Sequence, residues 1–171
     1  MTDKEILEGL GFITYGLYIV TSSYEGKDNA MIVNTVFQVT AEPARVAISV
    51  NKESLTHELI GKSRVFAAMP LAQTADLPFI GRFGFRTGRN FDKFAGLEVI
   101  RGQLGCPLIK QHTLSSLEVK VEQTVDVGTH TLFIGPVQDA VCFHLEPAVP
   151  MTYEYYHTVI KGKAPKGATH S

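Results

Sequence analysis

The chain has 171 residues, and its 16 Lys and Arg against 17 Asp and Glu give a formal net charge of −1 at pH 7. This length predicts one domain, and the near-neutral charge argues against nucleic acid as a partner and against a polybasic membrane anchor. A hydrophobic content of 44% with 19% charged residues excludes intrinsic disorder, and two cysteines cannot build a disulfide framework. We expect a cytoplasmic protein, because the N-terminus is acidic and no apolar run approaches the ~20 residues that span a bilayer.

The start of the chain predicts a short helix and a hairpin. A capping-box pattern at Thr2 opens a helix that ends near Leu10. Runs rich in β-branched and aromatic residues over 15–24 and 30–40 flank the polar stretch 25–29. This arrangement predicts a β-hairpin with a five-residue loop.

Two further strands are expected over 45–50 and 64–69, with a helix between them. The helix covers 54–61, since Ser54 is a good N-cap and Gly61 a good stop.

The second half of the chain predicts short helices over 75–85 and 90–96 and then two longer strands. Residues 117–127 alternate apolar and polar side chains, which is the period of a half-buried antiparallel strand. A strand over 130–143 follows a tight turn, and Pro136 must bend it or place it at an edge.

Near the C-terminus, residues 153–160 carry apolar side chains at helical spacing. We expect one domain over 1–160 and a mobile tail over 161–171, which has no apolar anchor. Many antiparallel strands with few short helices predict a mainly β fold of the barrel type.

Several motifs are absent from the sequence. It has no Gly-x-Gly-x-x-Gly, no phosphate-binding P-loop and no Gly-x-Ser-x-Gly. Cys142 and His144 come nearest to metal-ligand spacing, but zinc sites need at least three protein ligands, so we predict no metal site. Cys106 has no neighbouring acid or base in sequence and is expected to be an inert thiol.

The segment 81–93 combines three glycines with four cations. Glycines let backbone amides approach an anion closely, and the cations neutralise its charge, so a phosphate group suits this segment. The alternative is a basic surface loop. The cations are Arg82, Arg86, Arg89 and Lys93.

Small polar residues also occur among apolar strand positions, and a histidine opens a strand. Asn34, Thr35, Ser49 and Ser54 could bind the edge of a polar heterocycle, or they could be ordinary surface residues of strands. His130 follows the turn at Gly128, where a structural hydrogen-bonding role is the alternative to a functional one.

Four segments together resemble the flavin reductase-like FMN-binding split barrels, over about residues 5–166. They are N-A-M-I-V-N-T-V-F-Q-V-T-A-E-P at 29–43, V-A-I-S-V-N-K-E-S-L-T-H-E-L-I at 46–60, T-G-R-N-F-D-K-F at 87–94, and G-T-H-T-L-F-I-G-P-V at 128–137. The C-terminal M-T-Y-E-Y-Y-H-T-V-I-K-G-K-A-P-K resembles the branch that contains flavoredoxins and rubredoxin-fused flavin reductases.

The resemblance implies a homodimer of six-stranded antiparallel Greek-key barrels with short flanking helices. FMN would lie at the barrel rim, near the dimer interface, and His130 would lie beside the flavin and the nicotinamide as the catalytic residue. The implied cofactor-binding residues are Met31, Ile32, Val33, Asn34, Thr35, Ser49, Val50, Asn51, Ser54, Thr56, His57, Gly88, Arg89 and Lys93. Two departures from the family pattern occur: Thr129 replaces a common Asp before the histidine, and Ala44 replaces the second residue of a common Pro-Pro.

The function implied by the resemblance is NAD(P)H-dependent flavin reduction, with hydride passing from the nicotinamide to FMN and electrons passing on to an acceptor. Whether NADH or NADPH is the donor stays open. The alternative is a flavoredoxin-like electron carrier that holds FMN tightly and serves a rubredoxin- or ferredoxin-type partner. A third possibility is a barrel that binds a small molecule other than flavin.

Overall fold

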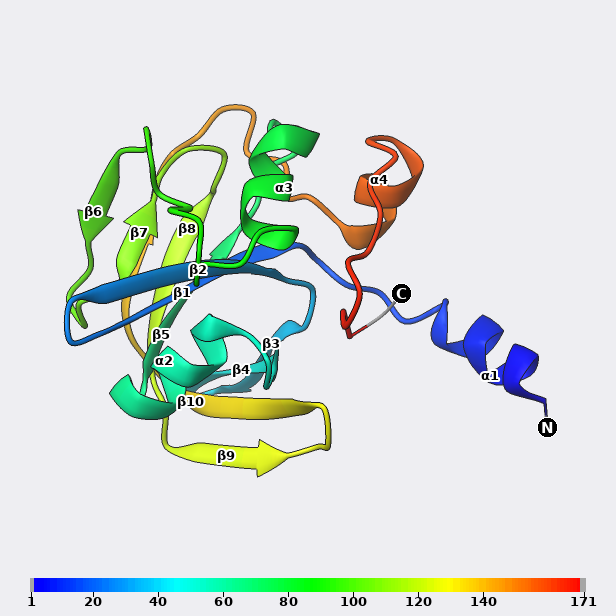
Figure 1. Ribbon diagram of the computed structural model, residues 1–171, viewed down its shortest axis with the longest axis horizontal. Helices are drawn as coiled ribbons and strands as arrows, with labels where there is room; N and C mark the ends of the chain where they lie inside the picture. Colours follow the sequence, from blue (N-terminus) through cyan, green and yellow to red (C-terminus); the bar gives the residue numbers. More distant parts are fainter. Residues whose placement is uncertain (1, 170–171) are drawn as a thin grey trace.

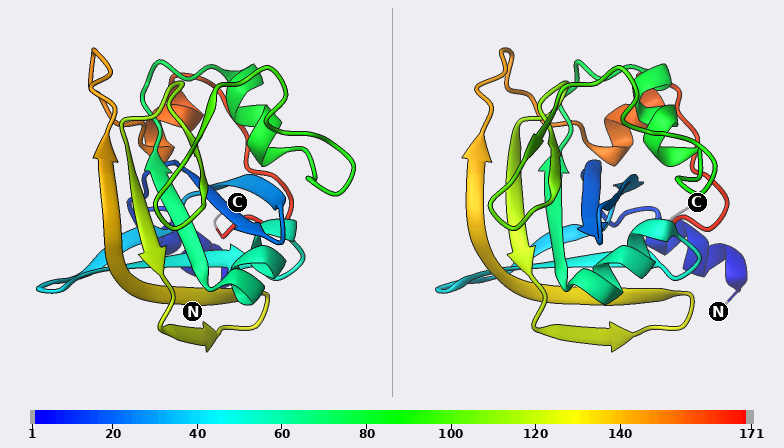
Figure 2. Two further views of the ribbon diagram at one scale, coloured as in Figure 1. Left: turned by 90° about the vertical axis from the view of Figure 1, so that its left-hand side faces the viewer. Right: turned by 60° about the vertical axis from the view of Figure 1, so that its left-hand side comes forward.

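The longest strand, β10 (His130–Cys142), organises the sheet. Its first half pairs antiparallel with β4 (Ala44–Asn51), and its second half pairs with β8 (Ser115–Lys120). The change of partner follows Pro136, and Figure 2 shows β10, in gold, bending sharply. A Cβ atom at Gly135 would overlap the carbonyl oxygen of Lys120, so only glycine allows this crossing.

The structure is a computed structural model that describes residues 2–169 (Figure 1). Eight strands form one sheet in the order β2-β1-β5-β8-β10-β4-β3, with β9 beside β10, and β6 pairs with β7 separately. The remaining elements are α1 (Asp3–Leu10), β1 (Tyr18–Tyr24), β2 (Lys27–Val33), β3 (Val36–Ala41), α2 (Leu55–Ser63), β5 (Val65–Pro70), α3 (Leu77–Gly84), β6 (Val99–Arg101), β7 (Pro107–Ile109), β9 (Gln123–Asp126) and α4 (Tyr153–Thr158).

The fold is mainly β, as predicted, although its main sheet has eight strands where six were expected. The sheet curls on itself, and α2 lies near one end of the curl while α3 and α4 lie near the other (Figures 1 and 2). Among residues 2–169, no helix combines the length and the hydropathy that a membrane span requires.

The centre of the sheet is buried on both faces. In β5, Phe66 and Ala68 belong to one hydrophobic cluster, and Ala67 and Met69 belong to the other. The strand therefore has a continuous apolar run with no alternation. β1 divides its side chains between the same two clusters.

The first hairpin turns more tightly than expected. Tyr24 pairs with Lys27, so the loop has two residues, Glu25 and Gly26, both with positive φ. Residues 27–29 are therefore in β2, and the prediction of a five-residue loop was wrong. A mirror-image two-residue turn matches the twist of the strands, and here a glutamate occupies a conformation that normally favours Asn, Asp or Gly.

Two helix predictions also needed correction. α2 begins after Ser54, as expected, but it passes Gly61 and ends at Ser63, because Arg64 takes the left-handed C-cap conformation with φ 63°. Residues 90–96 form turns and no helix, and one of these turns brings Lys93 into the interior.

The predicted strand 117–127 is two strands, β8 and β9. Its period-two pattern fails at Glu118, which is 1% exposed, and at Val125, which is 43% exposed. Glu118 is buried because its carboxylate accepts hydrogen bonds from the backbone N–H groups of Leu104 and Cys106. The segment therefore does not have one apolar, buried face and one polar, exposed face along its whole length.

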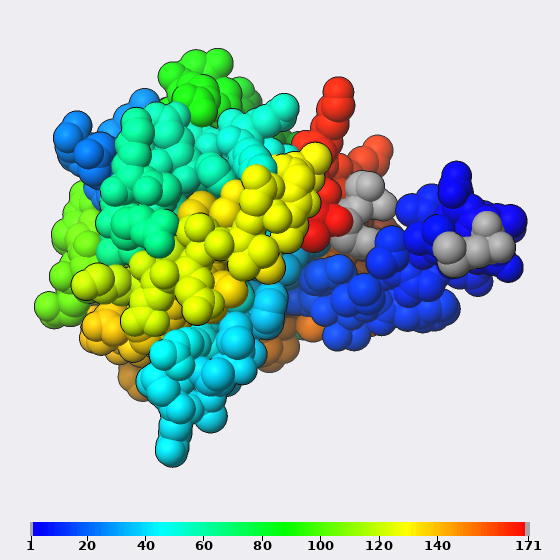
Figure 3. Space-filling model, turned by 90° about the horizontal axis from the view of Figure 1, so that it is seen from below, coloured from blue at the N-terminus to red at the C-terminus, as the bar shows by residue number. Residues whose placement is uncertain are grey.

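α1 stands apart from the rest of the molecule. The capping box at Thr2 is confirmed, yet none of the helix residues is buried. Figure 3 shows α1, in dark blue, projecting to one side of the body.

Candidate flavin site

A cavity of about 260 Å³ lies among β2, the end of β4, the start of α2, the loop after α3, α4 and the C-terminal residues 163–169. Fifteen site residues were predicted from the sequence, fourteen for cofactor binding and His130 for catalysis. Ten of the fifteen line this cavity: Met31, Ile32, Val33, Asn34, Ser49, Asn51, Ser54, Gly88, Lys93 and His130.

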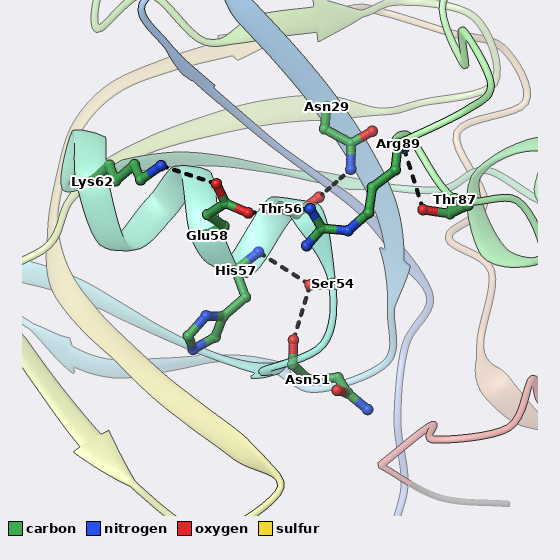
Figure 4. Close-up of polar contacts among 9 residues, drawn as sticks. All are labelled: Asn29, Asn51, Ser54, Thr56, His57, Glu58, Lys62, Thr87 and Arg89. Atoms are coloured by element: carbon green, nitrogen blue, oxygen red, sulfur yellow. Dashed lines mark hydrogen bonds and ion pairs between the residues drawn. The ribbon is translucent and has the colours of Figure 1, made fainter.

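Five of the named residues lie outside the lining: Thr35, Val50, Thr56, His57 and Arg89. Thr56 is fully buried and its hydroxyl accepts a 3.0 Å hydrogen bond from Asn29 Nδ2. The His57 ring lies 2.8 Å from the Thr131 hydroxyl and packs on Phe133. Arg89 pairs with Glu58 at 3.3 Å (Figure 4).

The N-terminus of α2 supplies a site for an anion. Ser54 Oγ accepts a hydrogen bond from the backbone N–H of His57 at 3.1 Å and donates to the carbonyl oxygen of Asn51 at 2.9 Å (Figure 4). The first-turn N–H groups of a helix lack partners within the helix and attract negative charge. Hydrogen bonds from Lys62 and Arg89 lower the pKa of Glu58, and these two cations compensate its charge in this turn.

The loop after α3 closes tightly on β2. A Cβ atom at Gly88 would overlap the side-chain oxygen of Asn29, which is 3% exposed. Glycine therefore lets the backbone of residues 87–88 form part of the cavity wall. Arg86 also lines the cavity, and its guanidinium lies 5.1 Å from the centroid of the Phe91 ring.

Lys93 is buried and connects two elements of the fold through its ammonium group. Its ammonium donates to the carbonyl oxygens of Ala30 at 2.8 Å and Phe83 at 3.0 Å, and the side chain is inside the protein with the residue 4% exposed. Burial lowers its pKa to about 8. Lys93 thus joins β2 to α3 across the floor of the site.

His130 and Asn51 face the cavity from paired positions of β10 and β4. His130 Nδ1 lies 2.8 Å from the hydroxyl of Thr129. Burial lowers the pKa of His130 below its ordinary 6.5, and no carboxylate opposes this effect at Thr129. The neutral imidazole is therefore the main form at pH 7.

The C-terminal wall of the cavity was not predicted from the sequence. Residues 163–169 line it, together with Tyr153 and Tyr156 of α4. A mobile tail over 161–171 was expected because the segment has no apolar anchor. Residues 170 and 171 lie outside the described part of the chain, and within 163–169 polar contacts are made to backbone carbonyl oxygens. Asn51 Nδ2 donates to the carbonyl oxygen of Gly167 at 2.9 Å.

The lining fits a flat, polar ring that carries an anionic group. Asn34 Nδ2 is buried and has no hydrogen-bond partner among residues 2–169, so it is available to a ligand. Apolar side chains such as Ile80 and Phe83 offer contact to a ring. The charged lining residues are the cations Arg86, Lys93, Lys163 and Lys166 and the carboxylate Glu53.

A curled antiparallel sheet with a cationic cavity at its edge defines a small β protein whose cavity suits a nucleotide-like cofactor. The chain belongs to the flavin reductase-like family: the sequence profile described as "Flavin reductase like domain" matches residues 10–161. The protein is therefore an oxidoreductase of the flavoprotein class.

Two relatives are each 46% identical to this chain. One is a high molecular weight rubredoxin from Moorella thermoacetica, where the match covers 94% of this chain and 69% of the relative. The other is a ferric-chelate reductase (NAD(P)H) from Archaeoglobus fulgidus, where it covers 92% of each. Among solved structures, flavoredoxin from Methanosarcina acetivorans matches with a TM-score of 0.70 and 25% identity, over 80% of this chain and 74% of that chain.

Proposed function

We propose that this protein binds FMN in the cavity and reduces it with NAD(P)H, passing the electrons on to an acceptor. The observation that carries the proposal is the buried Asn34 Nδ2, which has no hydrogen-bond partner among residues 2–169 and lies in the same cavity as the N-terminus of α2. A heterocycle edge and a phosphate are the two groups that these features suit. The relative named as an NAD(P)H ferric-chelate reductase supports the choice of donor.

The chain's own residues would divide the work of binding. The backbone of residues 31–34 and 49–51, with the Asn34 amide, would bind the ring edge, and Ser54 and Gly88 would lie at the phosphate. FMN, when bound, supplies the chemistry of accepting a hydride and releasing electrons singly or in pairs. Neutral His130 would orient the nicotinamide, and Lys93 would hold β2 and α3 in place beneath the ring.

Anaerobic mixing tests this function directly. The FMN-loaded protein is mixed with excess NADH and then NADPH, and the visible flavin absorbance is followed. Rapid bleaching is expected. A protein that binds FMN but is not bleached within minutes by either nucleotide contradicts the reductase function.

A second candidate function is an electron carrier serving a rubredoxin- or ferredoxin-type protein. The rubredoxin relative from Moorella thermoacetica favours it, as does Thr129 in place of the family's common aspartate. In this case a reduced ferredoxin or dithionite bleaches the flavin promptly, whereas NAD(P)H does not.

A homodimer forms part of the proposal. A second cavity of about 650 Å³, which shares Leu17 and Asn34 with the first, is lined by largely apolar residues of 13–18, β3 and 150–152. Phe37, which lines it, is 49% exposed, and Phe12 nearby in sequence is 79% exposed. Light scattering with size-exclusion chromatography tests this, and a monomer at micromolar concentration contradicts it.

A cytoplasmic location also belongs to the proposal. Cys106 is buried and Cys142 is exposed, and both are free thiols, as is usual in a reducing compartment.

A further inference from the structure

Residues 163–169, which we term the C-terminal strap, cross the edge of the cavity. Figure 4 shows the C-terminal chain passing on the Asn51 side of the site, and Figure 3 shows it, in red, at the surface beside the yellow β9–β10 hairpin. All seven strap residues line the cavity. The strap therefore forms part of the wall of the site.

Contacts with the fold hold the strap at Lys163 and at Gly167. The Tyr156 hydroxyl donates to the carbonyl oxygen of Lys163 at 3.0 Å, and Asn51 donates to that of Gly167 at 2.9 Å. Just before the strap, Gly162 lies so close to the Tyr156 ring that a Cβ atom would overlap it. The path of the strap across the cavity is thus fixed by specific contacts.

Two lysines of the strap have no internal charge partner. Lys163 and Lys166 both line the cavity, and neither forms an ion pair with a carboxylate among residues 2–169. Lys93, by contrast, is committed to two carbonyl oxygens. Arg86 is also free of ion pairs among the described residues, but its guanidinium packs on Phe91 in the loop after α3, so the strap lysines are the cations available on the Asn51 side.

The strap is tied to Asn51, whose carbonyl oxygen accepts from Ser54 at 2.9 Å, so the strap lies beside the start of α2 as well as beside His130. Ser54 and Gly88 contribute from α2 and the loop after α3, and Asn51 pairs with His130 across the sheet. The strap thus borders the side of the cavity where His130 would orient a nicotinamide. No Rossmann-type phosphate motif occurs in the sequence, so a dinucleotide needs another source of phosphate contacts.

We propose that Lys163 and Lys166 of the C-terminal strap bind the phosphate groups of the nicotinamide nucleotide that reduces the flavin. This inference rests on the proposed function and adds the residues that recognise the donor. They act as binding residues, so they govern the KM for the donor and leave the hydride step unchanged.

The test uses the full chain with Lys163→Ser/Lys166→Ser. Its control, Lys110→Ser/Lys161→Asn, removes the same charge from exposed residues outside the lining, and Asn suits the positive φ of Lys161. For each protein we would measure the Kd for FMN by fluorescence, kcat and KM for NADPH and NADH, and the inhibition constant of inorganic pyrophosphate. A third variant, Lys163→Arg/Lys166→Arg, restores the charge.

The strap variant should raise the donor KM and the pyrophosphate inhibition constant about tenfold or more, because each lost charge-assisted contact is worth about tenfold in affinity. Its kcat and its Kd for FMN should match the control, and the Arg variant should recover most of the lost affinity. An unchanged donor KM overturns the inference, and so does a raised Kd for FMN, which would place the strap at the flavin phosphate. Failure of the proposed function is seen separately, in wild-type protein that binds FMN without oxidising NAD(P)H.

Discussion

Asn51 and Gly167 are 116 residues apart in sequence, and a 2.9 Å hydrogen bond from the Asn51 side-chain amide to the Gly167 carbonyl joins them. The other side-chain atom, Asn51 Oδ1, accepts from the backbone N–H of Glu53 at 2.8 Å. This second bond fixes the orientation of the amide, so its N–H₂ group faces the strap. One side chain at the end of β4 thereby shapes both the start of α2 and the C-terminal wall of the cavity.

Replacing Asn51 by Asp tests this connection. The carboxylate keeps the acceptor for Glu53 but presents an oxygen to the Gly167 carbonyl, so the strap should open more often. We expect trypsin to cleave after Lys163 and Lys166 about fivefold faster, since the net value of one hydrogen bond is ~1 kcal/mol. Mass spectrometry of timed digests measures the rate. Gln38→Glu, an exposed change of the same chemistry on β3, is the control, and equal rates in both variants contradict the expectation.

His130→Gln should slow flavin reduction by NAD(P)H by tenfold or more, about the smallest effect expected of a group that positions a reactant, while FMN stays bound. Because burial lowers the pKa of His130 below 6.5, the wild-type rate constant should be level from pH 7 upward and change only in more acid solution. The Gln variant should lack that acid-side change. Stopped-flow absorbance across pH 5.5–8.5 measures both effects.

His57→Ala is the matched control for His130. Its ring contacts Thr131 and Phe133 outside the cavity, so its loss should lower stability and leave the rate constant of reduction within about twofold of wild type. A rate in His130→Gln equal to that of wild type would remove His130 from the proposed mechanism.

Lys93 should make stability rise with pH in an alkaline window. Its pKa is about 8 in the folded protein and 10.5 when exposed, so between these values the unfolded chain binds more protons. The free energy of unfolding therefore gains from this group as pH rises from 8 to 10.5, and that gain is lost as pH falls through 8. The linkage amounts to at most about 3 kcal/mol.

Urea titrations of wild type and Lys93→Met at pH 7, 8, 9 and 10 measure this gain. The stability difference between the two proteins should be constant up to pH 8 and then grow. Lys110→Met, at an exposed position, corrects for the loss of any lysine. A difference that stays flat up to pH 10 shows that Lys93 titrates normally.

Two glycine substitutions should act in opposite directions. Gly88→Ala places a methyl group against the Asn29 side chain, whose buried bond to Thr56 must then break, at a cost of about 1–3 kcal/mol and with weaker FMN binding. Gly61→Ala in α2 meets no atom within 4 Å and should stabilise by about 0.5–1 kcal/mol with FMN affinity unchanged. Thermal melts and FMN titrations measure both, and a loss of FMN affinity in both variants would argue against a specific role of the Gly88 loop.

Parts of the fold that depend on residues close together in sequence, such as a helix N-cap or a proline bend, were predicted correctly. The start of α2 at Ser54, β4 and the bend of β10 near Pro136 were all expected from the sequence. The predictions of the hairpin loop and of the end of α2 were wrong because Glu25 and Arg64 adopt positive φ. A glutamate or an arginine in the sequence does not indicate this conformation. The prediction that Glu118 is exposed was wrong because its carboxylate accepts hydrogen bonds from Leu104 and Cys106. These residues lie outside the predicted strand, so the strand's own pattern could not indicate them.

The site was predictable where one stretch of sequence supplies several lining residues. Residues 31–34 line the cavity as a run, and Asn51 and Ser54 follow from a single strand-to-helix turn. The strap was missed because it is held by Asn51 and Tyr156, whose partners are carbonyl oxygens that any residue type provides. Arg89 was placed at the cofactor from the resemblance, and its ion pair with Glu58 instead positions it beside α2, outside the lining.

The cavity draws its lining from Leu17 to Thr169, and this span has a consequence for biosynthesis. A domain folds as a unit, so the cavity is complete only when the strap is available to the sheet. A chain without the strap would have the α2 and β2 walls but would lack the wall beside Asn51. Complete binding of a cofactor in this cavity therefore requires that the last described residues of the chain have been synthesised.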